Sequence, residues 1–191
     1  MSEATQRARA ERAYDAIERC ANNNSIVQGL SGLAGFPFTL GTDVAVVPLY
    51  YVPLWNEIRD IYERTPVREE VVAPFLTELL PDLLTDLALD KILGSVPLAG
   101  IYFNAICAKA MTWRLGTLFA FMSSCGQRLP EDHARPALAL IRGLFPQEQM
   151  FKFQTPDRAR FLRFVTGIGG VDPDEARRRI DRALAELERD P

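Results

Sequence analysis

The chain has 191 residues, of which 48% are hydrophobic and 25% charged, and its formal net charge is -3. This composition is typical of a globular domain and argues against a disordered chain or a polytopic membrane protein. The weak negative charge argues against nucleic acid as a partner, because phosphate polymers are bound by clustered Lys and Arg. The N-terminal sequence MSEATQRARAERAYDAIERC has no apolar signal-peptide core, so we expect a cytoplasmic protein.

The N-terminal segment 2–21 predicts an amphipathic helix. Ala10, Tyr14 and Ile17 recur at helical spacing, while Arg and Glu fill the other faces. The asparagines at 22–24 are predicted to end this helix.

The next helix is predicted over 43–64, after a turn rich in glycine and proline, and Asp43 can cap it. Pro48 and Pro53 fall in its first half. An internal proline lacks the N–H that bonds four residues back and costs about 3 kcal/mol, so we expect a kink or an interrupted helix.

A further helix is predicted to begin at Pro66, and Pro74 and Pro81 are expected to divide the following stretch into two or three short pieces. A long apolar helix is then predicted from about Pro97 to Ser124.

The C-terminal part predicts three more helices. Pro130 opens the first, Thr155 with Pro156 opens the second, and Asp172 caps the third in a capping box with Glu175. The last helix has a narrow apolar stripe, so we expect it to pack on another element or on a partner. Strand signals are nearly absent, so the predicted fold class is all-α, a compact bundle around the long apolar helix. We expect a helical core over 1–150 and a helical appendage over 151–191 that packs on the core or on a partner.

The uncharged run of the long helix is too short to predict a simple membrane span. The uncharged run 92–108 has 17 residues and contains Gly94 and Pro97, whereas a span needs about 20 apolar residues. A longer span would place Lys109 and Arg114 near the bilayer centre, at about 2.5 to 3.5 kcal/mol each.

Small residues recur at every fourth position of this helix. Such a ridge allows another backbone to approach closely. The ridge drifts about 40° per step relative to the helical period, so a straight partner should meet only three or four of its positions. The positions are Gly100, Asn104, Ala108, Thr112, Gly116, Ala120 and Ser124.

Charge divides the middle of the chain. The range 43–90 holds ten acidic residues and three arginines, whereas 91–128 holds four cations and no acid. One interpretation is internal: Lys109 and Arg114 extend along apolar neighbours and meet carboxylates of the acidic half. The candidate carboxylates are Asp43, Asp86 and Asp90.

The other interpretation is that Lys109, Arg114 and Trp113 face anionic lipid or an acidic partner surface. Both interpretations remain open at the level of sequence. The candidate interaction residues are therefore Asp43, Lys109, Trp113 and Arg114.

Residue patterns for catalysis are missing from the sequence. His133 is the only histidine, and the three cysteines have no C-x-x-C spacing, so no zinc set is predicted and the thiols are expected to be reduced. The phosphate-binding pattern G-x-x-x-x-G-K-[ST] does not occur. We predict no enzyme activity, no metal and no cofactor.

The glycine and proline turn, the Asp-led apolar helix, the acidic middle and the segment VPLAGIYFNAICAKAMTWRLGTLFAF resemble the YcjF-type helical domain of unknown function, which accompanies bacterial GTPases. The EcsC family has a similar entry into an apolar helix. The resemblance implies an all-α, membrane-associated module without its own catalysis. This chain departs from it at Pro48 and Pro53 and carries no GTPase domain. The residues that carry the resemblance are Pro37, Asp43, Pro97, Gly100, Thr112 and Gly116.

We therefore expect a helical module that docks peripherally on the inner membrane or on a membrane-bound partner such as a GTPase, through the hairpin centred on 109–121. The alternatives are a soluble adaptor or homo-oligomeric structural protein and, third, a helical bundle that binds a small molecule.

Overall fold

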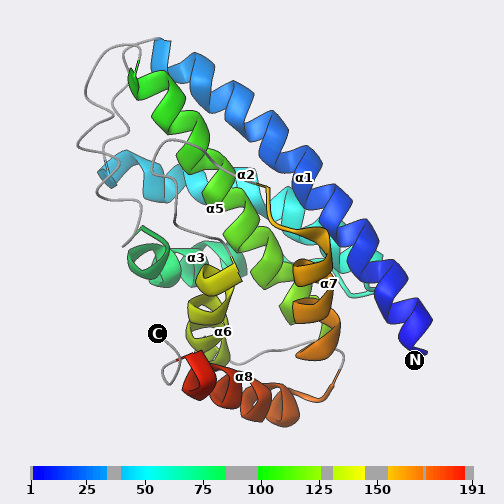
Figure 1. Cartoon of the computed structure of the whole chain (residues 1–191). Helices are drawn as coiled ribbons and strands as arrows, with labels where there is room; N and C mark the ends of the chain where they lie inside the picture. The colour runs from blue at the N-terminus through cyan, green and yellow to red at the C-terminus, as the bar shows by residue number, and fades with distance from the viewer. Residues whose placement is uncertain are drawn as a thin grey trace.

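The computed structural model is a bundle of α-helices (Figure 1). It describes residues 2–33, 40–84, 99–125, 131–144, 155–169 and 171–187. Within these ranges the chain is helical with short connections and contains no strand, which confirms the predicted all-α fold class. The helices are α1 (Glu3–Leu33), α2 (Leu40–Ile61), α3 (Glu69–Leu84), α5 (Ala99–Ser124), α6 (Glu131–Leu144), α7 (Arg158–Gly167) and α8 (Pro173–Leu187).

The two longest helices, α1 and α5, run antiparallel and side by side (Figure 1). They are in close contact at Gly116, where an added Cβ atom would lie 2.6 Å from Cγ1 of Ile17. Leu33 lies 16 residues after Ile17, and Ala99 lies 17 residues before Gly116. The C-terminal end of α1 and the N-terminal end of α5 are therefore level with each other.

Aromatic side chains of several helices pack on α5 to form the core. Trp55 of α2 stacks on Phe119 of α5, with ring centroids 4.5 Å apart and planes 2° apart, and Phe75 of α3 lies 5.4 Å from the same indole. Burial of aromatic and aliphatic side chains of this kind is the main stabilising contribution to a helical bundle.

Helix α1 is longer than the sequence predicts. It continues through the three asparagines to Leu33, so the expected end at 22–24 is wrong. Three asparagines cost a helix about 2 kcal/mol relative to alanine. Asn22 and Asn23 are exposed, while Ile17 and Ala21 are buried in the core. The packing of α1 along α5 therefore outweighs the low helix propensity of the three asparagines.

The prolines do not interrupt α2 or α3 where an interruption was expected. Helix α2 is one helix across Pro48 and Pro53, and α3 continues across Pro74 and Pro81 to Leu84. Each proline removes one helical hydrogen bond. Where the side chains are described, around Pro53 and Pro74, apolar residues on both sides of the proline are buried in the core. On α2 these buried residues include Tyr51, Leu54, Trp55 and Ile58.

The C-terminal helices pack on the same core as the others. Helix α7 begins at Arg158, capped by Asp157, whose Oδ1 accepts a hydrogen bond from the Arg160 N–H at 2.8 Å. Phe161 and Phe164 of α7 are buried among core residues. The start expected at Thr155 and Pro156 is therefore displaced by two to three residues.

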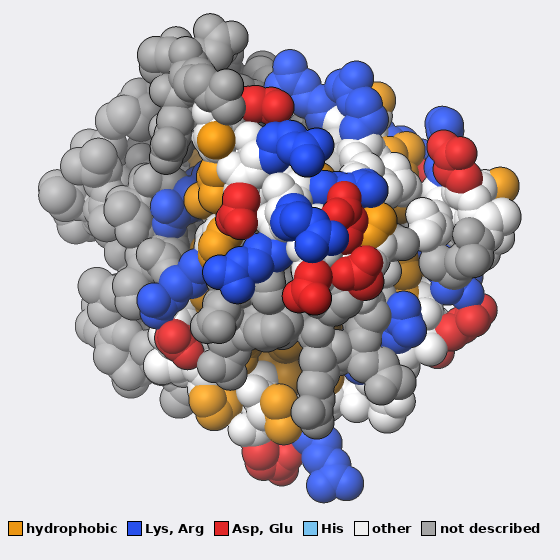
Figure 2. Space-filling view, turned by 90° about the horizontal axis from the view of Figure 1, so that it is seen from below, with side chains coloured by type: hydrophobic (Ala, Val, Ile, Leu, Met, Phe, Trp, Pro, Cys, Tyr) orange, Lys and Arg blue, Asp and Glu red, His pale blue; other side chains and the backbone are white. Residues whose placement is uncertain are grey.

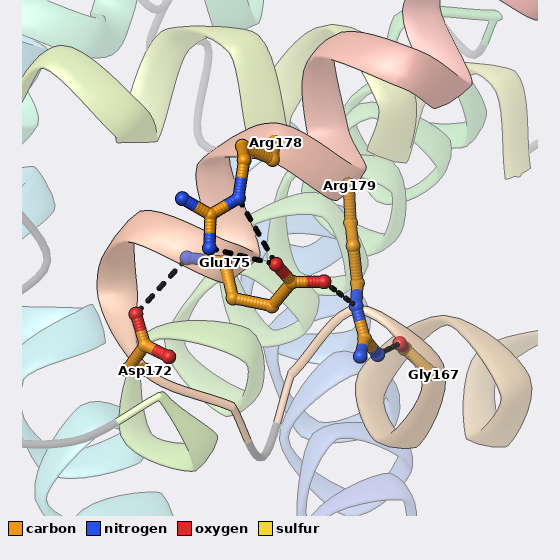
Figure 3. A network of polar contacts seen from close by, with 5 residues as sticks. All are labelled: Gly167, Asp172, Glu175, Arg178 and Arg179. Carbon is orange, nitrogen blue, oxygen red and sulfur yellow. Dashed lines mark hydrogen bonds and ion pairs between the residues drawn. The ribbon is translucent and has the colours of Figure 1, made fainter.

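Helix α8 begins at the cap that the sequence predicts, and a polar network joins it to α7 (Figure 3). The Glu175 N–H donates to Asp172 Oδ1 at 3.0 Å. The Glu175 carboxylate accepts hydrogen bonds from Arg178 and from Arg179 Nε, and Arg179 Nη1 donates to the Gly167 carbonyl at 2.5 Å. The first turn of α8 is thereby tied to the last residue of α7.

Candidate functional site

The α1–α5 pair has one charged half and one uncharged half. The sequence contains no charged residue from Cys20 to Thr42 or from Ile92 to Ala108. Because the helix ends are level, the uncharged part of α1 (20–33) and that of α5 (99–108) lie at the same end of the molecule, at the top of Figure 1. We call these two helical segments the uncharged tip.

Lys109 marks the boundary of the uncharged tip. It is the first charged residue of α5, and its side chain is half-buried. Lysine and arginine can extend an apolar stem along neighbouring side chains while the charged group stays in a polar layer. This position suits a cation that lies between an apolar environment and water.

Trp113 lies in the core, away from any docking surface. Its exposed fraction is 1%, and its ring centroid lies 4.9 Å from that of Tyr14 and 6.4 Å from that of Phe161. The Tyr14 hydroxyl donates to the Pro156 carbonyl at 2.8 Å, and the Arg158 guanidinium lies over the Tyr14 ring. The structure thus uses Trp113 to join α1, α5 and α7.

Arg114 is also buried, with an exposed fraction of 5%. The burial of Arg114 is what the internal interpretation expects. The other interpretation, in which Trp113 and Arg114 face lipid or a partner, is wrong for these two residues, because residues 112–121 are all buried in this structure and form no docking surface. Of the carboxylates expected near the cations, Asp43 belongs to the first turn of α2 but its side chain lies outside the described residues. Asp86 and Asp90 lie outside them altogether.

The small-residue ridge of α5 meets three different elements in succession. The Thr112 hydroxyl lies 3.4 Å from that of Tyr51 on α2, and Gly116 packs on Ile17 of α1. About two turns after Gly116, the ridge residue Ser124 meets the loop that follows α7. A Cβ atom added to Gly169 in this loop would lie 1.9 Å from the Ser124 Oγ. These three ridge positions therefore face α2, α1 and the segment after α7, respectively.

The described surface at the end opposite the uncharged tip carries many charged side chains. Figure 2 views the molecule from below in Figure 1 and shows Lys or Arg side chains interspersed with Asp and Glu. Across the described part of the chain, Val71 is the one large hydrophobic residue classed as exposed, at 64%. No described helix combines the length and the apolar character that crossing a membrane requires.

The remaining candidates for chemistry do not come together among the described residues. Cys20 is half-buried and Cys125 is buried, with its Sγ 3.9 Å from the Ser124 Oγ. The side chain of His133 lies outside the described residues. In the ranges that the structure describes, no three His, Cys, Asp or Glu side chains are grouped so that they could hold a metal ion.

The second half of α1 is a part of the uncharged tip that the residue pattern alone does not reveal. No charge falls between Arg19 and Asp43, which is a signal for it. A helix that ends at the asparagines, as predicted, leaves the uncharged stretch after them as a separate short segment, whereas the structure continues α1 through it to Leu33.

No family model, no curated protein and no solved structure matches this chain.

Proposed function

We propose that this protein is a non-enzymatic helical module that docks peripherally on an anionic membrane surface through the uncharged tip. The observation that carries the proposal is the pairing of two uncharged helix ends at one end of the molecule, with Lys109 at their boundary. The α5 part of the tip, AGIYFNAICA, is mainly apolar, whereas the α1 part also carries uncharged polar residues. Apolar segments bordered by cations are typical of proteins that lie in the membrane interface.

The length of the uncharged tip suits one leaflet. The segment of α5 from Ala99 to Ala108 has ten residues and is about 15 Å long at 1.5 Å per residue. The hydrocarbon core of a bilayer is about 30 Å thick, so this segment reaches its middle without crossing it. Lys109 then lies at the level of the lipid phosphates, where each cation contributes about 1 kcal/mol.

The charge distribution over the rest of the molecule supports the same orientation. The described part of the face in Figure 2, opposite the uncharged tip, carries many charged side chains of both signs. Helix α8 lies at this end of the molecule in Figure 1, and its Arg177, Asp181 and Arg182 are exposed. This end faces water when the uncharged tip is in the bilayer. The core around Trp113 stays intact, so docking requires no unfolding.

Co-sedimentation with vesicles tests the proposal. The wild-type protein is expected to bind vesicles that contain anionic lipid, and less strongly at high salt, because salt screens the attraction. Ile101→Asp places a carboxylate in the uncharged tip at a cost of about 2.5 to 3.5 kcal/mol, which lowers the affinity more than tenfold. Val71→Asp, on the exposed surface of α3, is the matched control and should bind like the wild type.

Two outcomes would contradict membrane docking. One is the absence of binding at every lipid composition. The other is a discrete oligomer in the absence of lipid that Ile101→Asp dissociates, because the uncharged tip would then be a contact between subunits, as in the homo-oligomer alternative.

A further inference from the structure

Helix α8 is anchored to the bundle by little apolar surface. Of its described side chains, Ala176 and Ile180 are buried. Ala183 and Leu184 are half-buried at the edge of the core. Helix α7 has 10 residues against 15 in α8, yet it buries four larger side chains, Phe161, Leu162, Phe164 and Val165. Because hydrophobic stabilisation grows with the buried apolar area, α8 is held less firmly than α7.

The helix that supports α8 has other supports of its own. Among the described residues, α8 packs mainly on α6. Helix α6 also packs on α5 and on α3, so it can keep its place in the bundle without α8. The buried side chains of α6 include Ala134, Ala137, Leu138 and Ile141. The surface that α8 covers therefore belongs to an element that stays fixed when α8 leaves.

The polar network of Figure 3 is mostly internal to α8 and its cap. Asp172 accepts a hydrogen bond from the Glu175 N–H, and the Glu175 carboxylate holds Arg178 and Arg179 one turn further on. The hydrogen bond from Arg179 Nη1 to the Gly167 carbonyl crosses to α7. This contact is exposed to water, where a charged side chain gains little from one partner. Most of the network therefore moves together with α8.

The chain that leads into α8 is fixed to the core at Gly169. A Cβ atom added to Gly169 would lie 1.9 Å from the Ser124 Oγ and 2.2 Å from the Val165 carbonyl oxygen. The backbone of Gly169 thus lies directly against α5 and α7. Helix α8 begins four residues later, at Pro173. A movement of α8 about this fixed point leaves α7 and the core in place.

We propose that α8 is a strap that releases from α6 as a unit while the other helices stay folded. In the closed state it covers part of α6 at the end of the molecule opposite the uncharged tip (Figure 1). Release uncovers that surface together with Ala176 and Ile180 of α8 itself. Elements with few buried apolar contacts open at a lower free energy than the whole protein. The strap thus controls access to α6 without unfolding of the core.

Native-state hydrogen exchange, measured by mass spectrometry, tests the proposal. A helix of 15 residues is marginal in water by itself, so the amides of released α8 exchange. In the wild type, peptides from α8 should be protected at least about 100-fold less than peptides from α5, because α5 is exposed only by global unfolding. Low urea concentrations should change the exchange of α8 little, since its release exposes little surface.

Two substitutions separate the release of α8 from global unfolding. Phe161→Leu weakens contacts with Tyr14 and Trp113, which are formed in both the closed and the released state. It should therefore speed exchange in α5 by about fivefold or more and leave exchange in α8 unchanged. Ile180→Ala destabilises the closed state and should speed exchange in α8 at least about tenfold.

Arg182→Gln is the matched control on α8, because Arg182 is exposed, and exchange in α8 should stay within about twofold of the wild type. Circular dichroism establishes that each variant folds, and Ile17→Val, a smaller change in the same core, replaces Phe161→Leu if that variant does not fold. Ile101→Asp in the uncharged tip should not change exchange in α8, so the two proposals can fail separately. Equal protection of α8 and α5 in the wild type, or equal acceleration of both helices by the core substitution, would overturn the proposal.

Discussion

Gly116 shows how one residue sets the distance between the two longest helices. A glycine inside a helix is about 1 kcal/mol less favourable than alanine, so its presence in α5 needs a compensating contact. The contact is Ile17, which occupies the space that a Cβ would fill. Gly167, at the end of α7, differs because no atom lies within 4 Å of its added Cβ.

We predict that Gly116→Ala destabilises the protein by about 1 kcal/mol, because overpacking of about 1 to 3 kcal/mol exceeds the gain in helix propensity. Ile17→Ala alone should cost about 2 to 5 kcal/mol. The double variant should lose less free energy of unfolding than the two single variants lose together, by at least about 1 kcal/mol. The reason is that the smaller side chain at position 17 leaves room for the added Cβ at position 116. Urea unfolding measures all four free energies.

Gly167→Ala serves as the control for helix propensity and should be neutral or slightly stabilising. Simple additivity of Gly116→Ala and Ile17→Ala would mean that the two residues are not in contact.

The connection between α7 and α8 shows how a cap and a few charges join two short elements. Asp172 caps α8, and Glu175 holds Arg178 and Arg179, of which the latter reaches Gly167 on α7 (Figure 3). The hydrogen bonds from Arg179 and Arg178 lower the pKa of Glu175. The network therefore depends on the ionised carboxylate.

This network should make the stability of the wild type depend on acid pH. A carboxylate with a lowered native pKa contributes stability that is fully present above its ordinary pKa of 4.5 and is lost as the pH falls through the native value. Glu175→Gln should therefore be less stable than the wild type at pH 7, and the difference should shrink towards pH 3. The urea midpoint at both pH values measures this effect.

Glu186→Gln changes an exposed acid near the other end of α8 and is the control for the loss of one negative charge, so its stability at pH 7 should stay close to that of the wild type. A stability difference for Glu175→Gln that is the same at pH 7 and pH 3 would contradict the role of the ionised carboxylate.

Element type was predictable from sequence, whereas the full lengths of α1 and α3 and the continuity of α2 were not. The Asp172 cap and the long apolar helix were located to within about two residues, because caps and apolar periodicity act locally. The extension of α1 through its asparagines and the continuity of α2 through its prolines depend on packing against other helices, which a local pattern does not contain. The burial of Trp113 also depends on α1 and α7.

At the scale of the whole molecule, the antiparallel register of α1 and α5 separates an uncharged end from a charged one. The register follows from the contact between Ile17 and Gly116. The sequence places no charged residue in α1 after Arg19 and none in α5 before Lys109. The proposed membrane docking uses this polarity. The core aromatic residues, including both tryptophans, lie in the other half and are buried.

Quenching of tryptophan fluorescence by lipids with brominated acyl chains tests the docking of the uncharged tip most directly. The wild-type protein, with only the buried Trp55 and Trp113, provides the baseline and should show no quenching when bound to anionic vesicles. The tryptophan introduced by Phe103→Trp should be quenched, because residue 103 lies in the uncharged tip. Vesicle-bound Phe103→Trp protein without quenching, or quenching of the wild type, would contradict the account.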